Sequence, residues 1–530
     1  MTTRTWITAT PPTPNGDLHV GHLAGPYTAA DVLRRFLTAD GADVRLTTGL
    51  DDHQGYVAVR GIKDGGRKPE EVADHYGASV TRTWKAAAVE FDHIVRPRRD
   101  AGYQQFVQSF FSGLYEAGHI VPRTRPLPYC ASCERWLYEG YLVGGCPLCG
   151  ASSNGNACEP CGRPNECGDL TDPRCVPCGA PAELRDATRL YFPLAPFAER
   201  LAAFWAEVDM PPHLRALCER MLADGLPEIA VSHPADWGVP VPVDGYEDQR
   251  IFVWCEMAPG YLWEQDPRGG TLPETGPVQF FGFDNGYFHA VLFPALFLAH
   301  DEATPLPRAF VVNEFYQLDG LKFSTSRRHA VWVHEALAAC GADVLRHHVL
   351  ADRPNGRETS FNLEALERTR HHLATLWDGW LGRLLTAVER DCGGRVPEEA
   401  PAGRAWELLR GRLHRIADEL REAYGVTGFD PRRAVALLDE AVACAADFGH
   451  VHAHERARPD GAAAHRRALA AQLAVAAALS AWAAPALPVG SARLAALLGV
   501  PANGRVDASA LAPLPAGRAV TAPTGAVFGG

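Results

Sequence analysis

The 530-residue sequence has no stretch that is typical of a membrane span or of an export signal. Its most apolar segment, ALAAQLAVAAALSAWAAPALP near residue 470, is mostly alanine and contains Gln472 and two prolines, which favours a packed helix. The first residues, MTTRTWITAT, lack a basic region followed by an apolar run. The sequence therefore predicts a cytoplasmic protein with no membrane partner, and we expect a monomer.

The sequence also lacks an excess of positive charge. It has 51 Lys and Arg against 63 Asp and Glu, a formal net charge of −12. This balance argues against indiscriminate binding to nucleic acid, although a local basic footprint stays compatible with it. With 47% hydrophobic and 22% charged residues the composition is globular, and the length predicts two to four domains.

The fourteen cysteines favour metal sites or chance over a disulfide framework in a cytoplasmic chain. Eight of them form four C-x-x-C pairs, and two such pairs complete a tetrahedral four-thiolate zinc site. Unrelated buried cysteines would have to produce this spacing four times, and no βαβ unit accompanies a redox pair. We therefore predict two structural Zn²⁺ ions, and Cys167 belongs to no pair. The predicted ligand sets are Cys146, Cys149, Cys158 and Cys161, and, closing around them, Cys130, Cys133, Cys175 and Cys178.

The stretch PPTPNGDLHVGH (11–22) follows the predicted strand TWITAT and leads into a helical apolar pattern. His19 and His22 share one helix face, and Gly21 leaves room for a ring to lie against the backbone. Where a strand ends and a helix begins, imidazoles can donate to an α-phosphate. Alone, the two histidines could also be zinc ligands or a surface pair without function, and the surface pair is the commoner case.

A second motif, LDGLKFSTSRRHAV (318–331), has the Gly, Ser, Thr, Lys and Arg that suit a loop around triphosphate. Together the two motifs resemble the HIGH and KMSKS signatures of class I aminoacyl-tRNA synthetases. The methionyl-tRNA synthetase family is the most similar, over residues 5 to about 365. The resemblance implies an α/β fold, with a Rossmann-like catalytic domain, a zinc-knuckle insertion and a C-terminal α-helical bundle. It also implies ATP-dependent activation of an amino acid, with Mg²⁺, to aminoacyl-AMP and its transfer to tRNA, methionine being the expected amino acid.

The resemblance also assigns roles to single residues. It makes His19, His22 and Lys322 catalytic. For ATP it implies Gly21, Gly282, Asp284, Lys322, Ser324 and Arg327. For the amino acid it implies Asp51, Trp254, Tyr261, His289, Pro11 and Thr13. Taken singly, the two aromatics fit core residues, the histidine fits a core histidine, and the aspartate fits a strand-end cap; their shared order favours the site.

The same resemblance divides the chain. Residues 1–115 and 231–315 are the halves of the catalytic domain, 116–230 the insertion, 316–360 the clamp loop and connecting region. Residues 361–510 are expected to form a helical bundle like an anticodon-binding domain, and 511–530 a loose tail. Periodicity supports the bundle: Leu413, Ile416 and Leu420 fall on one helical face, and Asp430 precedes Pro431 as an N-cap would.

Several positions depart from the family pattern. Thr325 replaces the second clamp-loop lysine, Pro11 and Thr13 replace the usual Leu and Tyr, and Asp460 stands where the family has an anticodon-reading Trp. Base stacking contributes about 1 to 3 kcal/mol, so we expect the CAU anticodon to be read poorly.

These departures leave two further hypotheses. One is a paralogue that makes an aminoacyl-adenylate for another tRNA or for a biosynthetic amine. The other is a non-catalytic module that binds zinc and nucleic acid. The residues that disfavour this last hypothesis are His19, His22, Asp51, Asp284 and Lys322.

Overall fold

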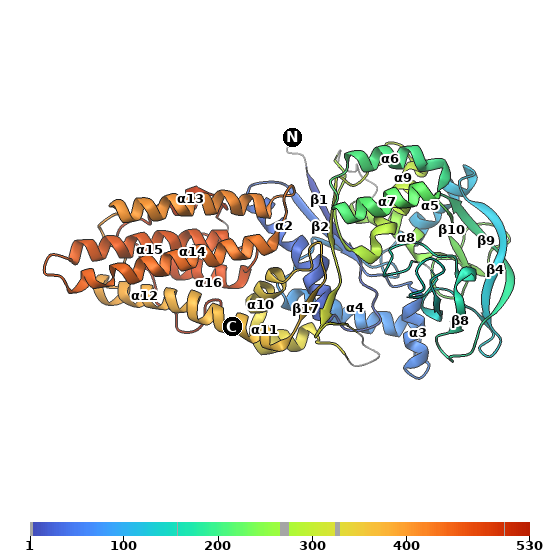
Figure 1. Ribbon diagram of the computed structural model, residues 1–530, viewed down its shortest axis with the longest axis horizontal. Helices are drawn as coiled ribbons and strands as arrows, with labels where there is room; N and C mark the ends of the chain where they lie inside the picture. Colours follow the sequence, from blue (N-terminus) through green and yellow to red (C-terminus); the bar gives the residue numbers. More distant parts are fainter. Residues whose placement is uncertain (1–3, 156, 266–274, 324–328, 503) are drawn as a thin grey trace.

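The computed structural model describes residues 4–155, 157–265, 275–323, 329–502 and 504–530. It is elongated, with a helical bundle at one end, a β-rich insertion at the other and an α/β domain between them (Figure 1). None of the helices in these described ranges is long and apolar enough to cross a membrane.

The α/β domain is built on a parallel five-stranded sheet in the order β14-β13-β1-β2-β3. The strands are β1 (Thr5–Ala9), β2 (Val44–Gly49), β3 (His93–Val95), β13 (Val278–Gly282) and β14 (Ala309–Asn313). Because β2 lies on one side of β1 and β13 on the other, the chain leaves the carboxyl ends of the central strands in opposite directions. Such a switch point opens a crevice in which α/β proteins bind ligands.

Helices cover both faces of this sheet, as alternating side chains of the strands require. Trp6 and Phe281 enter one core, while Ile7 and Phe280 enter the other. The helices on the first face are α5 (Tyr103–Glu116), α8 (Val253–Gln265) and α9 (Phe293–His300). Those on the second are α2 (Thr28–Ala39), α4 (Pro69–Ala86) and α10 (Val333–Ala351). The connections add α1 (Val20–His22), the π-helices η1 (Leu23–Tyr27) and η6 (Phe288–Leu292), α3 (Gly55–Lys63) and η5 (Phe283–Asn285).

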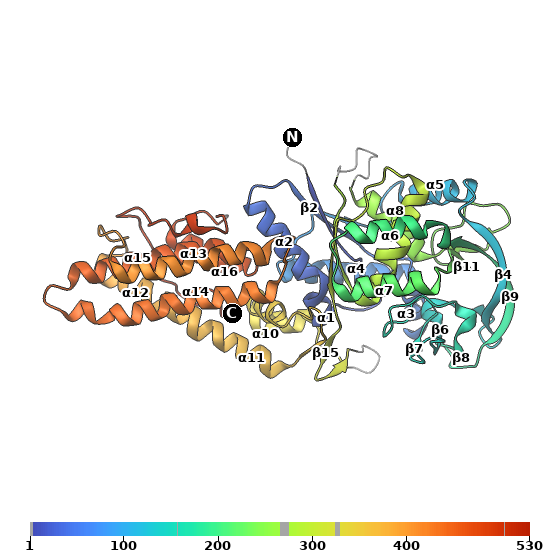
Figure 2. The same cartoon turned by 45° about the horizontal axis from the view of Figure 1, so that its top comes forward.

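The insertion leaves the sheet after β3 and returns at β13. Its long antiparallel ribbon pairs β4 (Val121–Cys130) with β9 (Glu183–Pro193), flanked by β5 (Arg135–Trp136) and β10 (Glu228–Ala230). A smaller sheet has β7 (Ser152–Ser153), β6 (Leu142–Gly145) and β8 (Thr171–Cys175) and lies close to α3 (Figure 2). The remaining elements are η2 (Glu139–Tyr141), η3 (Cys167–Asp169), η4 (Ala195–Phe197), α6 (Ala198–Glu207), α7 (Pro212–Asp224), β11 (Ser232–Pro234) and β12 (Gln249–Ile251).

A small sheet of β15 (Tyr316–Leu318), β16 (Leu321–Lys322) and β17 (Thr359–Phe361) connects the α/β domain to the bundle. The bundle contains α11 (Leu363–His372), η7 (Leu373–Asp378), α12 (Gly379–Cys392), α13 (Arg404–Tyr424), α14 (Pro431–His452), η8 (Ala453–Ala457), α15 (Ala462–Trp482), α16 (Pro488–Leu498) and η9 (Ala508–Leu511). The predicted apolar face of α13 is buried, and the Asp430 carboxylate accepts hydrogen bonds from the first backbone N–H groups of α14. The alanine-rich segment forms the buried helix α15, as predicted.

The last residues, 511–530, do not form the loose tail that their composition predicts. Val527 and Phe528 are buried, and the Phe528 ring packs edge-on against Trp377 at 4.8 Å. The carboxylate of Asp378 accepts hydrogen bonds from three successive backbone N–H groups of the tail. Both views place the C-terminus beside α10 and α11. One aromatic anchor and one carboxylate therefore outweigh the flexibility of the Gly, Ala and Pro around them.

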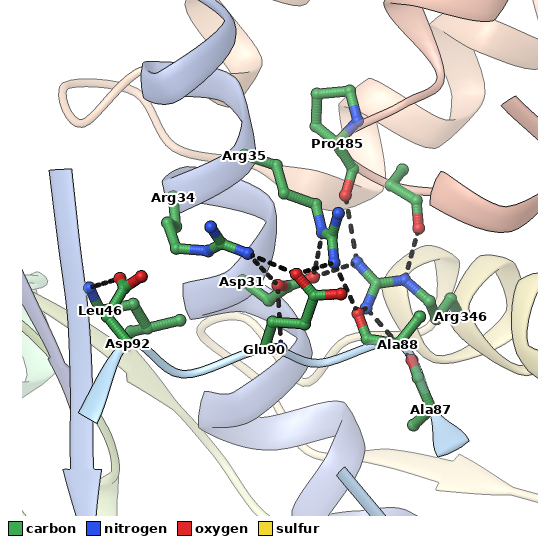
Figure 3. A network of polar contacts seen from close by, with 11 residues as sticks. Asp31, Arg34, Arg35, Leu46, Ala87, Ala88, Glu90, Asp92, Arg346 and Pro485 are labelled. Atoms are coloured by element: carbon green, nitrogen blue, oxygen red, sulfur yellow. Dashed lines mark hydrogen bonds and ion pairs between the residues drawn. The ribbon is translucent and has the colours of Figure 1, made fainter. Parts of the chain in front are cut away.

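A buried ionic network ties the bundle to the α/β domain (Figure 3). Arg346 of α10 and Asp31 of α2 are fully buried and form an ion pair of 2.8 Å. The guanidinium also donates to the carbonyls of Ala87 and Ala88 after α4, and to those of Pro485 and Ala486 between α15 and α16. One side chain thus joins three separate parts of the molecule.

Candidate functional site

A cavity of about 390 Å³ opens at the carboxyl ends of β1, β2, β13 and β14. The sequence motifs that are far apart along the chain meet here. The predicted residues that line it are Pro11, Thr13, His19, Gly21, His22, Asp51, Trp254, Gly282, Asp284 and Lys322. Two others, Ser324 and Arg327, lie with Thr325 outside the described residues.

Tyr261 and His289 lie behind this lining. Both are fully buried, and their rings meet edge-on at 5.6 Å. In front of them Trp254 stacks on Phe288, with the ring centroids 3.7 Å apart, and these two rings do face the cavity. Burial lowers the pKa of His289 to about 3, so the ring is neutral. Its Nε2 has no hydrogen-bond partner among the described residues.

The two histidines sit where the turn after β1 becomes helix. The backbone N–H of His19 donates to His22 Nδ1 at 3.2 Å, so a neutral His22 carries its hydrogen on Nε2. Burial lowers the pKa of His22 to about 4. The pKa of His19 is also lowered, mainly by burial and further by the charges of His22 and Lys322. A Cβ at position 21 would lie 3.0 Å from the His19 ring, so Gly21 makes the room that the sequence predicts. The pair therefore offers neutral N–H donors at neutral pH.

Asp51 follows β2 and lines the same cavity. Its Oδ2 accepts from the Thr13 hydroxyl at 3.3 Å, whereas the buried Oδ1 has no hydrogen-bond partner among the described residues. Burial, followed by the charges of Glu139 and Glu256, raises the pKa of Asp51 well above its usual value. A cationic group in the cavity would lower this pKa again, because an opposite charge favours the ionised carboxyl.

Asp284 follows β13, at the end of the cavity formed with β14. Burial raises its pKa to about 6, although backbone N–H groups favour the ionised form. A Cβ at Gly282 would lie 2.5 Å from Asp284 Oδ1, so glycine permits this approach. Asn313, which ends β14, also faces the cavity and was not predicted. Its signal in the sequence is a polar residue directly after the apolar run AFVV.

Lys322 reaches the cavity from β16 and forms an ion pair with Glu159 of the insertion. Glu159 lies between Cys158 and Cys161, so a cysteine turn contacts the clamp-loop lysine directly. The Nζ of Lys322 also lies 5.0 Å from the centroid of the Phe315 ring. A groove of about 750 Å³ shares these side chains and opens from the cavity between the insertion and the small sheet.

The eight paired cysteines form two clusters with the ligand sets that the sequence predicts, one set nested within the other along the chain. The Sγ atoms of Cys130 and Cys178 lie 3.5 Å apart, as do those of Cys149 and Cys158; Cys133 and Cys175 are 3.8 Å apart. Four sulfurs at 2.3 Å from zinc have edges of about 3.8 Å, so both clusters fit a tetrahedral Zn²⁺. Cys167 lies outside both and donates to the carbonyl of Gly155.

Comparison with known proteins agrees with this geometry. A family model described as "tRNA synthetases class I (M)" matches residues 5–385. The chain is 32% identical to a methionine–tRNA ligase of Thermomicrobium roseum, over 78% of this chain and 72% of that protein. It is also 35% identical to the methionine–tRNA ligases of Pyrococcus abyssi and Thermococcus kodakarensis, over 79% and 80% of this chain respectively. The chain spans only 61% and 60% of the lengths of these two proteins.

A solved structure shares the fold. Mycobacterium tuberculosis methionyl-tRNA synthetase in complex with methionyl-adenylate superposes with a TM-score of 0.81 at 23% identity, covering 99% of each chain.

Proposed function

Because the chain belongs to the class I tRNA synthetases of the methionyl family, we propose that it activates an amino acid with ATP and transfers the aminoacyl group to tRNA. A carboxylate oxygen of the amino acid attacks the α-phosphorus, pyrophosphate leaves with Mg²⁺, and an aminoacyl adenylate forms. Methionine is the amino acid proposed, after the names of the relatives.

The observation that carries this proposal is that the buried carboxyl of Asp51 and the neutral His19 and His22 line one cavity. The carboxylate would bind the ammonium group of the amino acid and so hold its carboxylate toward the α-phosphate. The two imidazoles would donate N–H hydrogen bonds to the phosphate oxygens as negative charge develops there. As neutral donors they stabilise this charge without a change in protonation.

The same orientation of the substrates suggests roles for the other cavity residues. Asp284, with Gly282, would accept hydrogen bonds from the ribose hydroxyls of ATP, and Gly21 would let the phosphates lie against the backbone. Lys322, with Ser324 and Arg327, would bind the leaving pyrophosphate, for which a compact ammonium charge is suited.

For the side chain of the amino acid we propose a pocket closed by Trp254 and Phe288, with Pro11 and Thr13 at its edge. The Tyr261 hydroxyl and His289 Nε2, which has no partner among the described residues, would reach it once the stacked rings move. A single movement of the two rings would thus open the pocket to an apolar side chain.

The acceptor is proposed to enter through the 750 Å³ groove beside the cavity, because the two share Glu159, Phe315 and Lys322. The names of the relatives favour tRNA over the biosynthetic amine as acceptor. Each cysteine cluster would hold one Zn²⁺ that fixes the insertion, because four thiolates leave no open position for catalysis.

The test is ATP–pyrophosphate exchange over a panel of amino acids, followed by transfer to total tRNA. We expect exchange with methionine above the other amino acids, and its loss in Asp51→Asn, which keeps the shape but removes the charge. Exchange with no amino acid of the panel would contradict activation. Exchange without any transfer to tRNA would instead point to a different acceptor.

A further inference from the structure

Three metal-binding side chains from three helices meet where the bundle joins the α/β domain, far from the cysteine clusters. They are His347 of α10, His372 at the end of α11 and Asp439 of α14. Their ligand atoms all lie within 4.8 Å of one another. Figure 1 shows α10 and α11 at this junction, with α14 running from it along the bundle.

The distances within this cluster fit a shared ion. The Nε2 atoms of His347 and His372 lie 3.3 and 2.9 Å from Asp439 Oδ1. A tetrahedral Zn²⁺ with ligands at about 2.0 to 2.1 Å separates them by about 3.3 Å. Of the three edges, the one from His347 to Asp439 already has this length, the one from His372 to Asp439 needs a shift of a few tenths of an ångström, and the one between the two histidines is at most 4.8 Å. Each ligand comes from a different helix, so binding would join elements 25 to 92 residues apart in the chain.

His372 approaches the carboxylate of Asp439 from the end of α11. His372 Nε2 is buried and lies 2.9 Å from Asp439 Oδ1. The ring of His372 is 40% exposed, which leaves a path for the ion and for a water ligand.

Trp377 supports the carboxylate in this arrangement. Its indole Nε1–H donates to Asp439 Oδ1 at 2.8 Å and its ring is fully buried. Metal-binding carboxylates are commonly held by such hydrogen bonds, which fix their orientation. Two imidazoles and one carboxylate are also a ligand set suited to zinc, which prefers nitrogen and sulfur but accepts oxygen.

We propose that His347, His372 and Asp439 bind a third Zn²⁺ ion, with water in the fourth position. This ion pins α14 of the bundle to α10 and α11. The site differs from the two cysteine clusters in its ligands and in its place, and it does not depend on the proposed activity.

The zinc content of the protein tests the assignment. The chain is equilibrated with buffered micromolar Zn²⁺, desalted without chelator and analysed by mass spectrometry. We expect three zinc ions per chain in the unaltered protein and two in His372→Ala and Asp439→Asn. His371→Ala, an exposed neighbour on the same helix, is the matched control and should keep three.

Stability gives a second readout. Added Zn²⁺ should raise the Tm of the unaltered protein and of His371→Ala but leave that of Asp439→Asn unchanged. Because asparagine keeps the shape and can still accept from Trp377, this variant should fold, as circular dichroism will show. Two zinc ions in the unaltered protein, or a third ion that persists in both ligand variants, would overturn the proposal and leave a hydrogen-bonded cluster without metal.

Discussion

Replacing Arg346 by methionine should weaken the attachment of the bundle to the α/β domain. Methionine keeps much of the volume but leaves four backbone carbonyls without their guanidinium donor. At about 1 kcal/mol for each acceptor, the loss is about 4 kcal/mol. Asp31 keeps Arg35 at 2.8 Å, so its charge stays compensated and the cost does not rise further.

Equilibrium urea unfolding, followed by tryptophan fluorescence and circular dichroism, measures this change. A lower midpoint with an unchanged m-value reports a change in stability. Arg433→Met is the matched control, because Arg433 of α14 pairs with Glu419 and Glu422, whose side chains are 46% and 61% exposed, and such pairs contribute at most about 1 kcal/mol. If Arg346→Met shifts the midpoint no more than this control does, the network does not hold the two parts together.

Four further predictions concern the proposed activity. His22→Ala should lower the rate of adenylate formation by about 10² to 10³-fold with little change in ATP binding, and weakened binding with an intact rate would contradict the role of the donor. The KM for ATP should rise as the pH falls through about 6, because protonation of Asp284 removes an acceptor; Asp284→Asn should show no such dependence. Glu159→Gln should lower the KM for ATP by at most about fivefold at constant kcat, because the partner that competes for Lys322 is lost. Changing one base of a CAU anticodon should alter kcat/KM for charging little, since Asp460 offers no ring for stacking; a several-hundredfold loss, about 3.5 kcal/mol, would show that the anticodon is read.

Features that depend on local spacing could be predicted from the sequence. The two cysteine clusters follow from four C-x-x-C pairs, and the N-cap at Asp430 follows from the proline after it. The position of His19 and His22 follows from a strand, a turn and a helical pattern, because parallel strands bring their carboxyl ends together.

Features that depend on single residues far apart could not be predicted. Asp31 and Arg346 are 315 residues apart, and neither belongs to a pattern. Phe528 lies in a segment whose composition predicts a loose tail, and its burial depends on the ring of Trp377 on another element. Burial of Tyr261 and His289 behind the cavity lining likewise depends on how Trp254 and Phe288 stack, which periodicity does not specify.

The nesting of the cysteine clusters sets an order for their assembly. Within the inner cluster the loop from Cys149 to Cys158 spans 9 residues, whereas the outer loop from Cys133 to Cys175 spans 42. Closing the longer loop costs about 1.4 kcal/mol more in chain entropy. During synthesis the inner ligands are also complete first, since Cys161 leaves the ribosome before Cys175. An ion captured early would shorten the free chain of the outer loop, so the second site becomes easier to load once the first is filled. Because the inner ligands are already bound when the last outer cysteines are made, mispairing between the two sets is also suppressed.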